Sequence, residues 1–90
     1  MPSQHFVPSL ANAIRASPLT QANALKALAI AGDVTNEAEW RDRAAAALCI
    51  GAMWAGEQKT PGEVAKAAGI PVAGVAKQLA AINERLKNAR

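Results

Sequence analysis

Residues 60–86 read TPGEVAKAAGIPVAGVAKQLAAINERL, and this stretch decides the fold. Thr60 and Glu63 have the spacing of a capping box, and Pro61 occupies the first helical position, so two independent signals predict a helix from Pro61 to Ala68. Gly69 marks a turn, after which Pro71 can open a second helix that runs to about Lys87. One apolar stripe on that helix steps by four, three and four residues: Val75, Leu79, Ile82 and Leu86.

The segment Thr60–Leu86 resembles the helix-turn-helix superfamily, in the style of the winged-helix repressors (MarR-like or ArsR-like). Ala65 matches the small residue of the first helix, Gly69 the turn glycine, and Val75 the branched apolar residue that follows. Helices that cross steeply need a small residue where their backbones meet and a residue that tolerates positive φ at the corner. A generic helical hairpin is the alternative. Flanking apolar positions also match: Val64, Ala68, Ile70, Leu79 and Ile82.

The resemblance implies that the second helix enters the major groove of DNA, with Lys77 and Gln78 closest to the bases. It places Val72 and Ala73 on the leading turn of that helix, where their methyl groups can touch thymine. Side chains that would contact phosphates are Lys59, Lys66, Arg85 and Lys87. Two features depart from the family pattern. The leading turn lacks the polar side chains that normally read base edges, and the chain ends at Arg90, so we expect no β-wing.

Composition predicts an all-α fold. Apolar residues make up 51% of the 90 residues and many are alanine, the strongest helix former, whereas aromatic residues are limited to Phe6, Trp40 and Trp54. The length fits one domain of four or five helices over residues 1–90. The formal net charge is +3, and the whole positive excess follows Glu57. This placement is a mild signal for a polyanionic partner, although an ordinary solvated surface would give the same pattern.

The first part of the chain divides into a flexible segment and a helical core over residues 9–56. We expect Met1 to Pro8 to be extended, and Ser9 to cap a short helix that ends at Ala16. Ser17 and Pro18 predict the start of a helix that ends before Gly32. Its core stripe is expected at Ala22, Leu25, Leu28 and Ala29.

A third helix is expected to begin at a cap formed by Thr35 or Asn36, with Asn36 and Glu39 spaced as a reciprocal cap. Its apolar face starts at Trp40, which we interpret as a core or interface anchor. Beyond Ala45 the helix is apolar all round, which is typical of a helix buried on every side. We therefore predict that residues 44–54, including Trp54, form the central core helix, and that Gly56 ends it.

No pattern favours catalysis, a metal or a cofactor. His5 is the only histidine and Cys49 the only cysteine, so there is no internal disulfide and no Cys/His cluster. Cys49 is expected to be an inert core thiol. The first residues lack a signal-peptide pattern, and apolar runs are too short to span a membrane. We expect a cytoplasmic protein that is not an enzyme.

These features favour a small helix-turn-helix protein that binds double-stranded DNA, as a bacterial or phage transcriptional regulator or accessory factor. The alternative is a helical protein-interaction module, an inhibitor or adaptor, that uses the same scaffold to dock on a protein. A homodimer is expected in the DNA-binding case, since such proteins commonly pair two half-sites. Its likeliest interface is formed by the helices within Leu10–Ala31.

Overall fold

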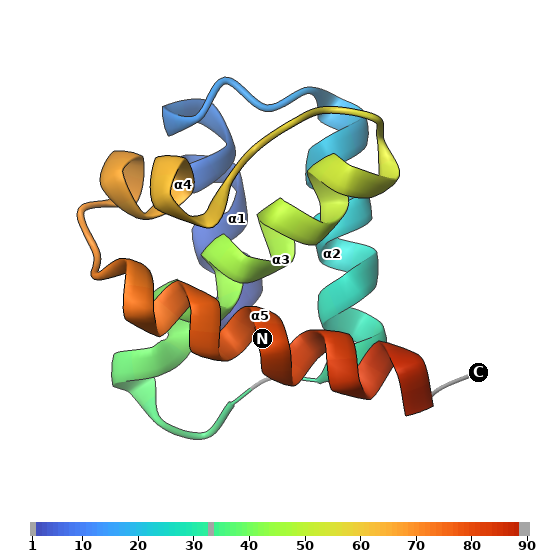
Figure 1. The fold of residues 1–90 in the computed structure, drawn as a ribbon, viewed down its shortest axis with the longest axis vertical. Coiled ribbons are helices and arrows are strands. Elements are labelled where there is room, and N and C mark those ends of the chain that lie inside the picture. The colour runs from blue at the N-terminus through green and yellow to red at the C-terminus, as the bar shows by residue number, and fades with distance from the viewer. Residues whose placement is uncertain (1, 33, 89–90) are drawn as a thin grey trace.

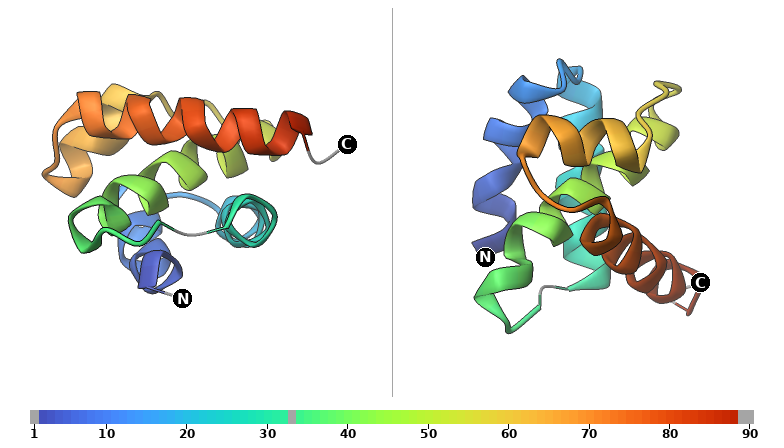
Figure 2. Two further views of the ribbon diagram at one scale, coloured as in Figure 1. Left: turned by 90° about the horizontal axis from the view of Figure 1, so that it is seen from below. Right: turned by 60° about the vertical axis from the view of Figure 1, so that its left-hand side comes forward.

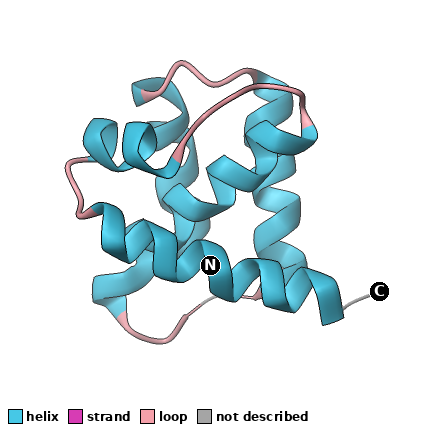
Figure 3. Ribbon diagram, in the orientation of Figure 1, coloured by secondary structure: helices cyan, strands magenta, loops and turns pink. Residues whose placement is uncertain are grey.

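The computed structural model describes residues 2–32 and 34–88, and these form five α-helices and one short 3₁₀ helix. The described residues contain no strand (Figure 3), which confirms the all-α prediction. The predicted breaks near Ser17, Gly32, Gly56 and Gly69 are all present. In chain order the elements are α1 (Pro2–Ala13), α2 (Pro18–Ala31), η1 (Glu37–Glu39), α3 (Trp40–Trp54), α4 (Pro61–Ala68) and α5 (Val72–Asn88).

Helix α3 runs through the middle of the molecule and contacts all the other helices (Figure 1). Helices α1 and α2 lie on one side of it, and α4 and α5 lie on the other (Figure 2). Residues 43–52 of α3 are all buried, as expected for a helix that is apolar all round. The last two residues of the predicted core helix depart from that expectation, because Met53 is 62% exposed and Trp54 is 44% exposed.

At Gly51, the backbone of α3 lies close to the backbone of α2. A Cβ atom at this position would lie 2.5 Å from the Thr20 carbonyl oxygen and 2.7 Å from the Ala24 amide nitrogen. The Gly51 carbonyl also accepts a hydrogen bond from the Asn23 side-chain amide at 3.3 Å. The abundance of alanine and glycine in α3 therefore has a packing reason: small residues let neighbouring backbones approach it.

The prediction that Met1 to Pro8 are extended was wrong for the part of this segment that the structure describes, which belongs to α1; residue 1 lies outside it. Ser9 lies inside α1 and does not cap it. Pro2 is placed at the first helical position, and Pro8 removes one amide donor from the helix, a loss that burial of the apolar face offsets. That face consists of Val7, Leu10, Ala11 and Ile14, all of which are buried.

Helix α2 begins and ends as predicted, but the face that it buries is not the predicted one. Ser17 accepts a hydrogen bond from the Thr20 amide at 3.2 Å, and the helix ends at Gly32. Of the predicted stripe Ala22, Leu25, Leu28 and Ala29, only Leu28 is buried. The residues that α2 buries are Thr20, Ala24, Ala27, Leu28 and Ala31. Because ten of the fourteen residues of this helix are apolar and occur on all its sides, the pattern alone does not fix its orientation, and the contact with Gly51 does.

Before α3, the predicted cap residue Asn36 does cap a helix, whereas Glu39 has a hydrogen-bond partner that the sequence does not predict. Asn36 accepts a hydrogen bond from the Ala38 amide at 3.0 Å, so Asn36 is the cap, but of η1. The Glu39 carboxylate accepts a hydrogen bond from Gln78 of α5, rather than completing a reciprocal cap. Trp40 is half-buried, and its indole N–H donates to the Val34 carbonyl at 3.1 Å.

Candidate nucleic-acid interface

Helices α4 and α5 are joined by a short turn whose geometry follows from the sequence. Thr60 accepts a hydrogen bond from the Glu63 amide at 3.2 Å and starts α4, with Pro61 in the first turn. Gly69 ends α4 in the left-handed region, with φ of 70°. The Ile70 amide then donates to the Ala65 carbonyl at 3.0 Å, the long-range bond of a Schellman motif.

The inner faces of α4 and α5 carry the apolar residues that the sequence predicts. Val64, Ala65, Val75 and Ile82 are buried in the core. Four partly buried side chains pack against that core from the same two helices and the turn, namely Ala68, Ile70, Leu79 and Leu86. The alternation of buried and exposed positions along α5 leaves one long face of this helix open to solvent.

That outer face of α5 has small side chains and few charges in its leading turns. Val72 is 51% exposed, and Ala73, Ala76, Lys77 and Ala80 are exposed as well. Lys77 is the one charged residue between Val72 and Leu79. The face can therefore approach a partner closely, with a single ammonium group near its middle.

Gln78, predicted to lie close to the bases, is buried instead, with 3% of its surface exposed. Its side-chain oxygen accepts a hydrogen bond from Arg43 at 3.2 Å, and its side-chain amide donates to Glu39 at 3.1 Å. Gln78 therefore fastens α5 to the start of α3 and is not on the surface that a ligand would meet. This burial does not support the expectation that Gln78 reads bases. The sequence does not predict the burial, because the partners of Gln78 lie more than 30 residues earlier in the chain.

Arg43 connects the same network to the end of α2. This arginine is 4% exposed, and its guanidinium donates to the Gly32 carbonyl at 2.8 Å and to the Ala31 carbonyl at 3.3 Å. A cation at a helix C-terminus is favourable because the last carbonyls have no partners within the helix. Arg43 thus stabilises the junction of α2, α3 and α5, a role that sequence reasoning missed.

The basic residues of the predicted interface, Lys77 and the four assigned to phosphate contacts, lie at three places along the chain. Lys66 in the last turn of α4 and Lys77 in α5 are exposed on either side of the turn. Arg85 and Lys87 are exposed in the last turn of α5, and Lys59 is half-buried before α4. Lys66 and Lys77 are therefore the two cations closest in sequence to the turn and to the leading part of α5.

Carboxylates lie beside the first turns of α5. Asp42 of α3 packs against Gly74, which is half-buried for that reason. Burial raises the pKa of Asp42, and the neighbouring Glu39 raises it further. These two acids oppose the approach of phosphate from the α3 side, so a polyanion would meet α5 from its outer face.

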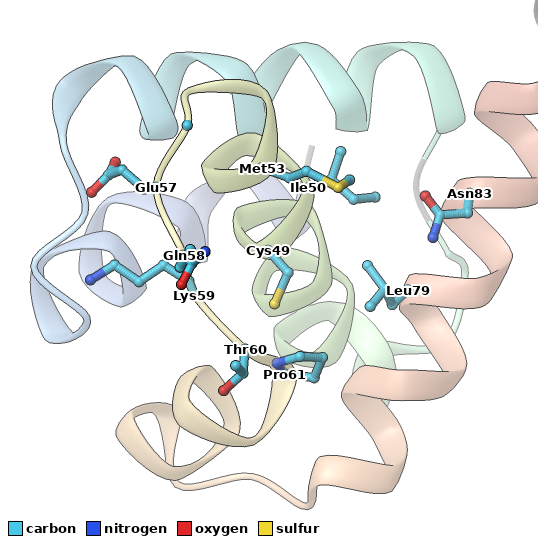
Figure 4. A pocket seen from close by; sticks show the side chains of 11 residues that line it. Cys49, Ile50, Met53, Glu57, Gln58, Lys59, Thr60, Pro61, Leu79 and Asn83 are labelled. Atoms are coloured by element: carbon cyan, nitrogen blue, oxygen red, sulfur yellow. The ribbon is translucent and has the colours of Figure 1, made fainter.

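A hollow lies between the second half of α3, the segment 56–61 and α5 (Figure 4). Its volume is about 630 Å³, and its lining includes Cys49, Ile50, Met53, Pro61 and Leu79. Sequence reasoning missed it because Met53 and Trp54 were assigned to the core; their position at the very end of the apolar run was the available signal.

The remaining candidate residues show no site chemistry. His5 is exposed on α1. Cys49 is 7% exposed, and burial raises the pKa of its thiol to about 11, which disfavours the nucleophilic thiolate. The described part of the chain contains no group of three or more side chains suited to hold a metal ion.

A scan against protein-family models finds no match, and comparisons with curated proteins and with solved structures find none either. None of the helices that the structure describes has the length and apolarity needed to cross a membrane. Function is therefore inferred from the surfaces described above.

Proposed function

We propose that the chain binds double-stranded DNA through α4 and α5, with the outer face of α5 in the major groove. The observation that carries this proposal is the open outer face of α5, a helix that a short turn joins to α4. The exposed residues Lys66 of α4 and Lys77 of α5 precede and follow that turn in the sequence. The resemblance of residues 60–86 to helix-turn-helix motifs points to the same use of these two helices.

The composition of that face favours binding with little sequence discrimination. Because Gln78 is buried, Lys77 is the single side chain in the leading turns of α5 that can donate a hydrogen bond to a base edge. Ala73 and Ala76 offer only methyl contacts, such as those to thymine. Affinity would then come mainly from phosphate contacts by Lys66, Lys77 and Arg85. This suits a transcriptional regulator or accessory factor of bacterial or phage type, acting in the cytoplasm.

The two lysines beside the turn provide the test. Lys66→Glu and Lys77→Glu should each lower the affinity for a generic duplex several-fold, and to the same extent on duplexes of different sequence. Fluorescence anisotropy of labelled duplexes measures this directly. Arg15→Glu is the control, since Arg15 is exposed in the turn before α2, outside the proposed contact surfaces, and undergoes the same change of charge. Equal affinities of all three variants and the wild type would contradict the proposal.

A second candidate is protein docking by the leading turn of α5, favoured by the exposure of Val72 and by the withdrawal of Gln78 from the surface. In that case Val72→Glu should abolish partner capture, because it would bury an unpaired charge in the interface. Lys66→Ala and Lys77→Ala should then have little effect. The response to the lysine variants therefore separates the two candidates.

The DNA-binding proposal includes a homodimer that pairs two copies of α5 on adjacent half-sites. Within Leu10–Ala31, the outer face of α2 is the better candidate interface. Leu19 is 57% exposed and Ile30 is 46% exposed on that helix, with the small residues Ala22 and Ala29 also exposed between them. Small residues between two larger apolar anchors allow a second helix to pack closely.

A further inference from the structure

The hollow beside α3 continues into a second one, and together they form what we call the α3–α5 groove. The second hollow has a volume of about 300 Å³, shares Met53 and Asn83 with the first, and adds Trp54, Leu86 and Lys87. The α5 wall of the groove consists of Leu79, Asn83, Leu86 and Lys87, spaced at i, i+4, i+7 and i+8. This wall is about 12 Å long at the rise of an α-helix.

The groove is lined by apolar side chains together with polar ones such as Asn83, and it includes the exposed apolar residues Met53 and Trp54. Ile50 is fully buried at the floor, whereas Met53 is 62% exposed and Trp54 is 44% exposed at the α3 wall. Figure 4 shows Met53 and Ile50 side by side on the flank of α3 that faces Asn83. Tryptophan and methionine are enriched where proteins contact each other, and an elongated groove with two hollows suits an extended partner with two anchor residues.

The charges around the groove favour an acidic partner. The charged residues of its lining are Glu57, Lys59 and Lys87. The Glu57 carboxylate accepts hydrogen bonds from Ser17 and Thr20 at the start of α2, and the charge of Lys59 beside it helps to lower its pKa, so the two charges of the first hollow offset each other. Among the residues that the structure describes, Lys87 is the one charged residue that lines the second hollow, and no carboxylate opposes it there.

We propose that the α3–α5 groove binds one face of an acidic amphipathic helix in another protein. Two apolar side chains of that helix, one or two turns apart, would occupy the two hollows, and a carboxylate beside them would approach Lys87. Asn83, between the hollows, offers a hydrogen-bonding group at the centre. This inference uses the second half of α5, whereas the DNA-binding proposal places its leading turns in the major groove, and it holds whether or not those leading turns bind DNA.

The test uses the whole chain and three synthetic helical peptides of about four turns. One carries leucine at i, i+3, i+4 and i+7 with glutamate beside them, the second has lysine in place of each glutamate, and the third is a scrambled version of the first. Titration calorimetry should show that the acidic peptide binds about tenfold more tightly than the basic one, since favourable charge pairs become repulsive. In a Trp40→Phe chain, the acidic peptide should also shift the emission of Trp54.

Met53→Ser provides the decisive variant, and Leu25→Ser is its matched control because both residues are exposed apolar side chains. Met53→Ser should weaken binding of the acidic peptide at least several-fold, and Leu25→Ser should leave it unchanged. Lys87→Glu should reduce the preference for the acidic peptide. Circular dichroism and thermal melting confirm that each variant is folded.

Three results would overturn the proposal: equal binding of the acidic and scrambled peptides, no effect of Met53→Ser, or a self-association in sedimentation that Met53→Ser abolishes. The last result would assign the groove to a second copy of this chain. Failure of DNA binding would leave all three peptide measurements unchanged, so the two proposals fail separately.

Discussion

At Gly51, the packing of α2 on α3 leaves no room for a side chain. A methyl group there would meet backbone atoms of Thr20 and Ala24, which cannot move without displacing α2. Gly51→Ala should therefore lower the free energy of unfolding by about 1–3 kcal/mol, the usual cost of overpacking. Urea denaturation followed by circular dichroism measures the difference.

Gly62 in α4 is the matched control for this substitution. A Cβ atom at Gly62 would meet nothing within 4 Å, and its φ is not positive. Gly62→Ala should instead raise the free energy of unfolding by up to about 1 kcal/mol, because alanine is the better helix former. The same sign of change for both variants would contradict the account of the α2–α3 crossing.

Glu57 should make the stability of the protein sensitive to acid. Hydrogen bonds from the Ser17 side chain, then from Thr20 and the Ser17 amide, lower the pKa of this carboxyl below its ordinary value. A lowered pKa means that the stabilisation is present above the unfolded-state pKa, near 4.5, and is lost as the pH falls through the folded-state pKa.

Glu57→Gln tests this linkage. The variant should have a lower melting temperature than the wild type at pH 7, and the difference should shrink as the pH is lowered through the range in which the wild-type carboxylate becomes protonated. Glu84→Gln, on the exposed face of α5, is the control. A gap between Glu57→Gln and the wild type that is independent of pH would refute the assigned role.

Single residues also show where sequence reasoning stops. Lys66 and Lys77 could be assigned to the surface because a lysine beside an apolar stripe is normally solvated. Gln78 could not be assigned correctly, since its burial depends on Arg43 and Glu39, which only the tertiary structure brings to α5. The signal that existed was Arg43 itself, a charged residue at the edge of a run of alanines.

At the scale of elements, the cap of α4 should have a measurable effect. Thr60→Ala removes the acceptor for the Glu63 amide and should cost about 1 kcal/mol of stability. Thr35→Ala, at an exposed position before η1, should cost much less. Equal melting temperatures for Thr60→Ala and the wild type would mean that the cap contributes nothing to folding.

Helix ends could be predicted from the sequence, whereas helix orientation could not. Ser17, Gly32, Gly56, Thr60 and Gly69 act through their own backbone and a few neighbours, so local chemistry is sufficient. The buried side of α2 depends on Gly51, which follows more than 20 residues later. Two prolines made the first residues appear extended, although the apolar spacing from Val7 to Ile14 is helical.

For the whole molecule, self-association is the first test. Sedimentation at tens of micromolar should show a homodimer, and Leu19→Glu on the outer face of α2 should convert it to a monomer, because the charge would be buried in the interface. Gln4→Glu, at an exposed position of α1, should leave the dimer intact. A monomeric wild type would remove the dimer from the proposal.

The α3–α5 groove and the open face of α5 exist only in the folded molecule as a whole. The groove exists because α3 ends with Met53 and Trp54 beyond the cover of its neighbours, and α5 crosses near that end. The sequence shows two apolar segments at these places but not their juxtaposition. Prediction therefore succeeded for the all-α class and for most helix ends, and failed for the first helix and for surfaces assembled from distant segments.

The salt dependence of duplex binding is the sharpest test of whether α4 and α5 bind DNA. If α4 and α5 bind DNA through phosphate contacts, the logarithm of the binding constant should fall linearly with the logarithm of salt concentration, with a slope of about −0.9 for each contact. Lys66→Ala and Lys77→Ala should each reduce the magnitude of the slope by about one. Absence of duplex binding at low salt, or a slope that neither substitution changes, would contradict the claim.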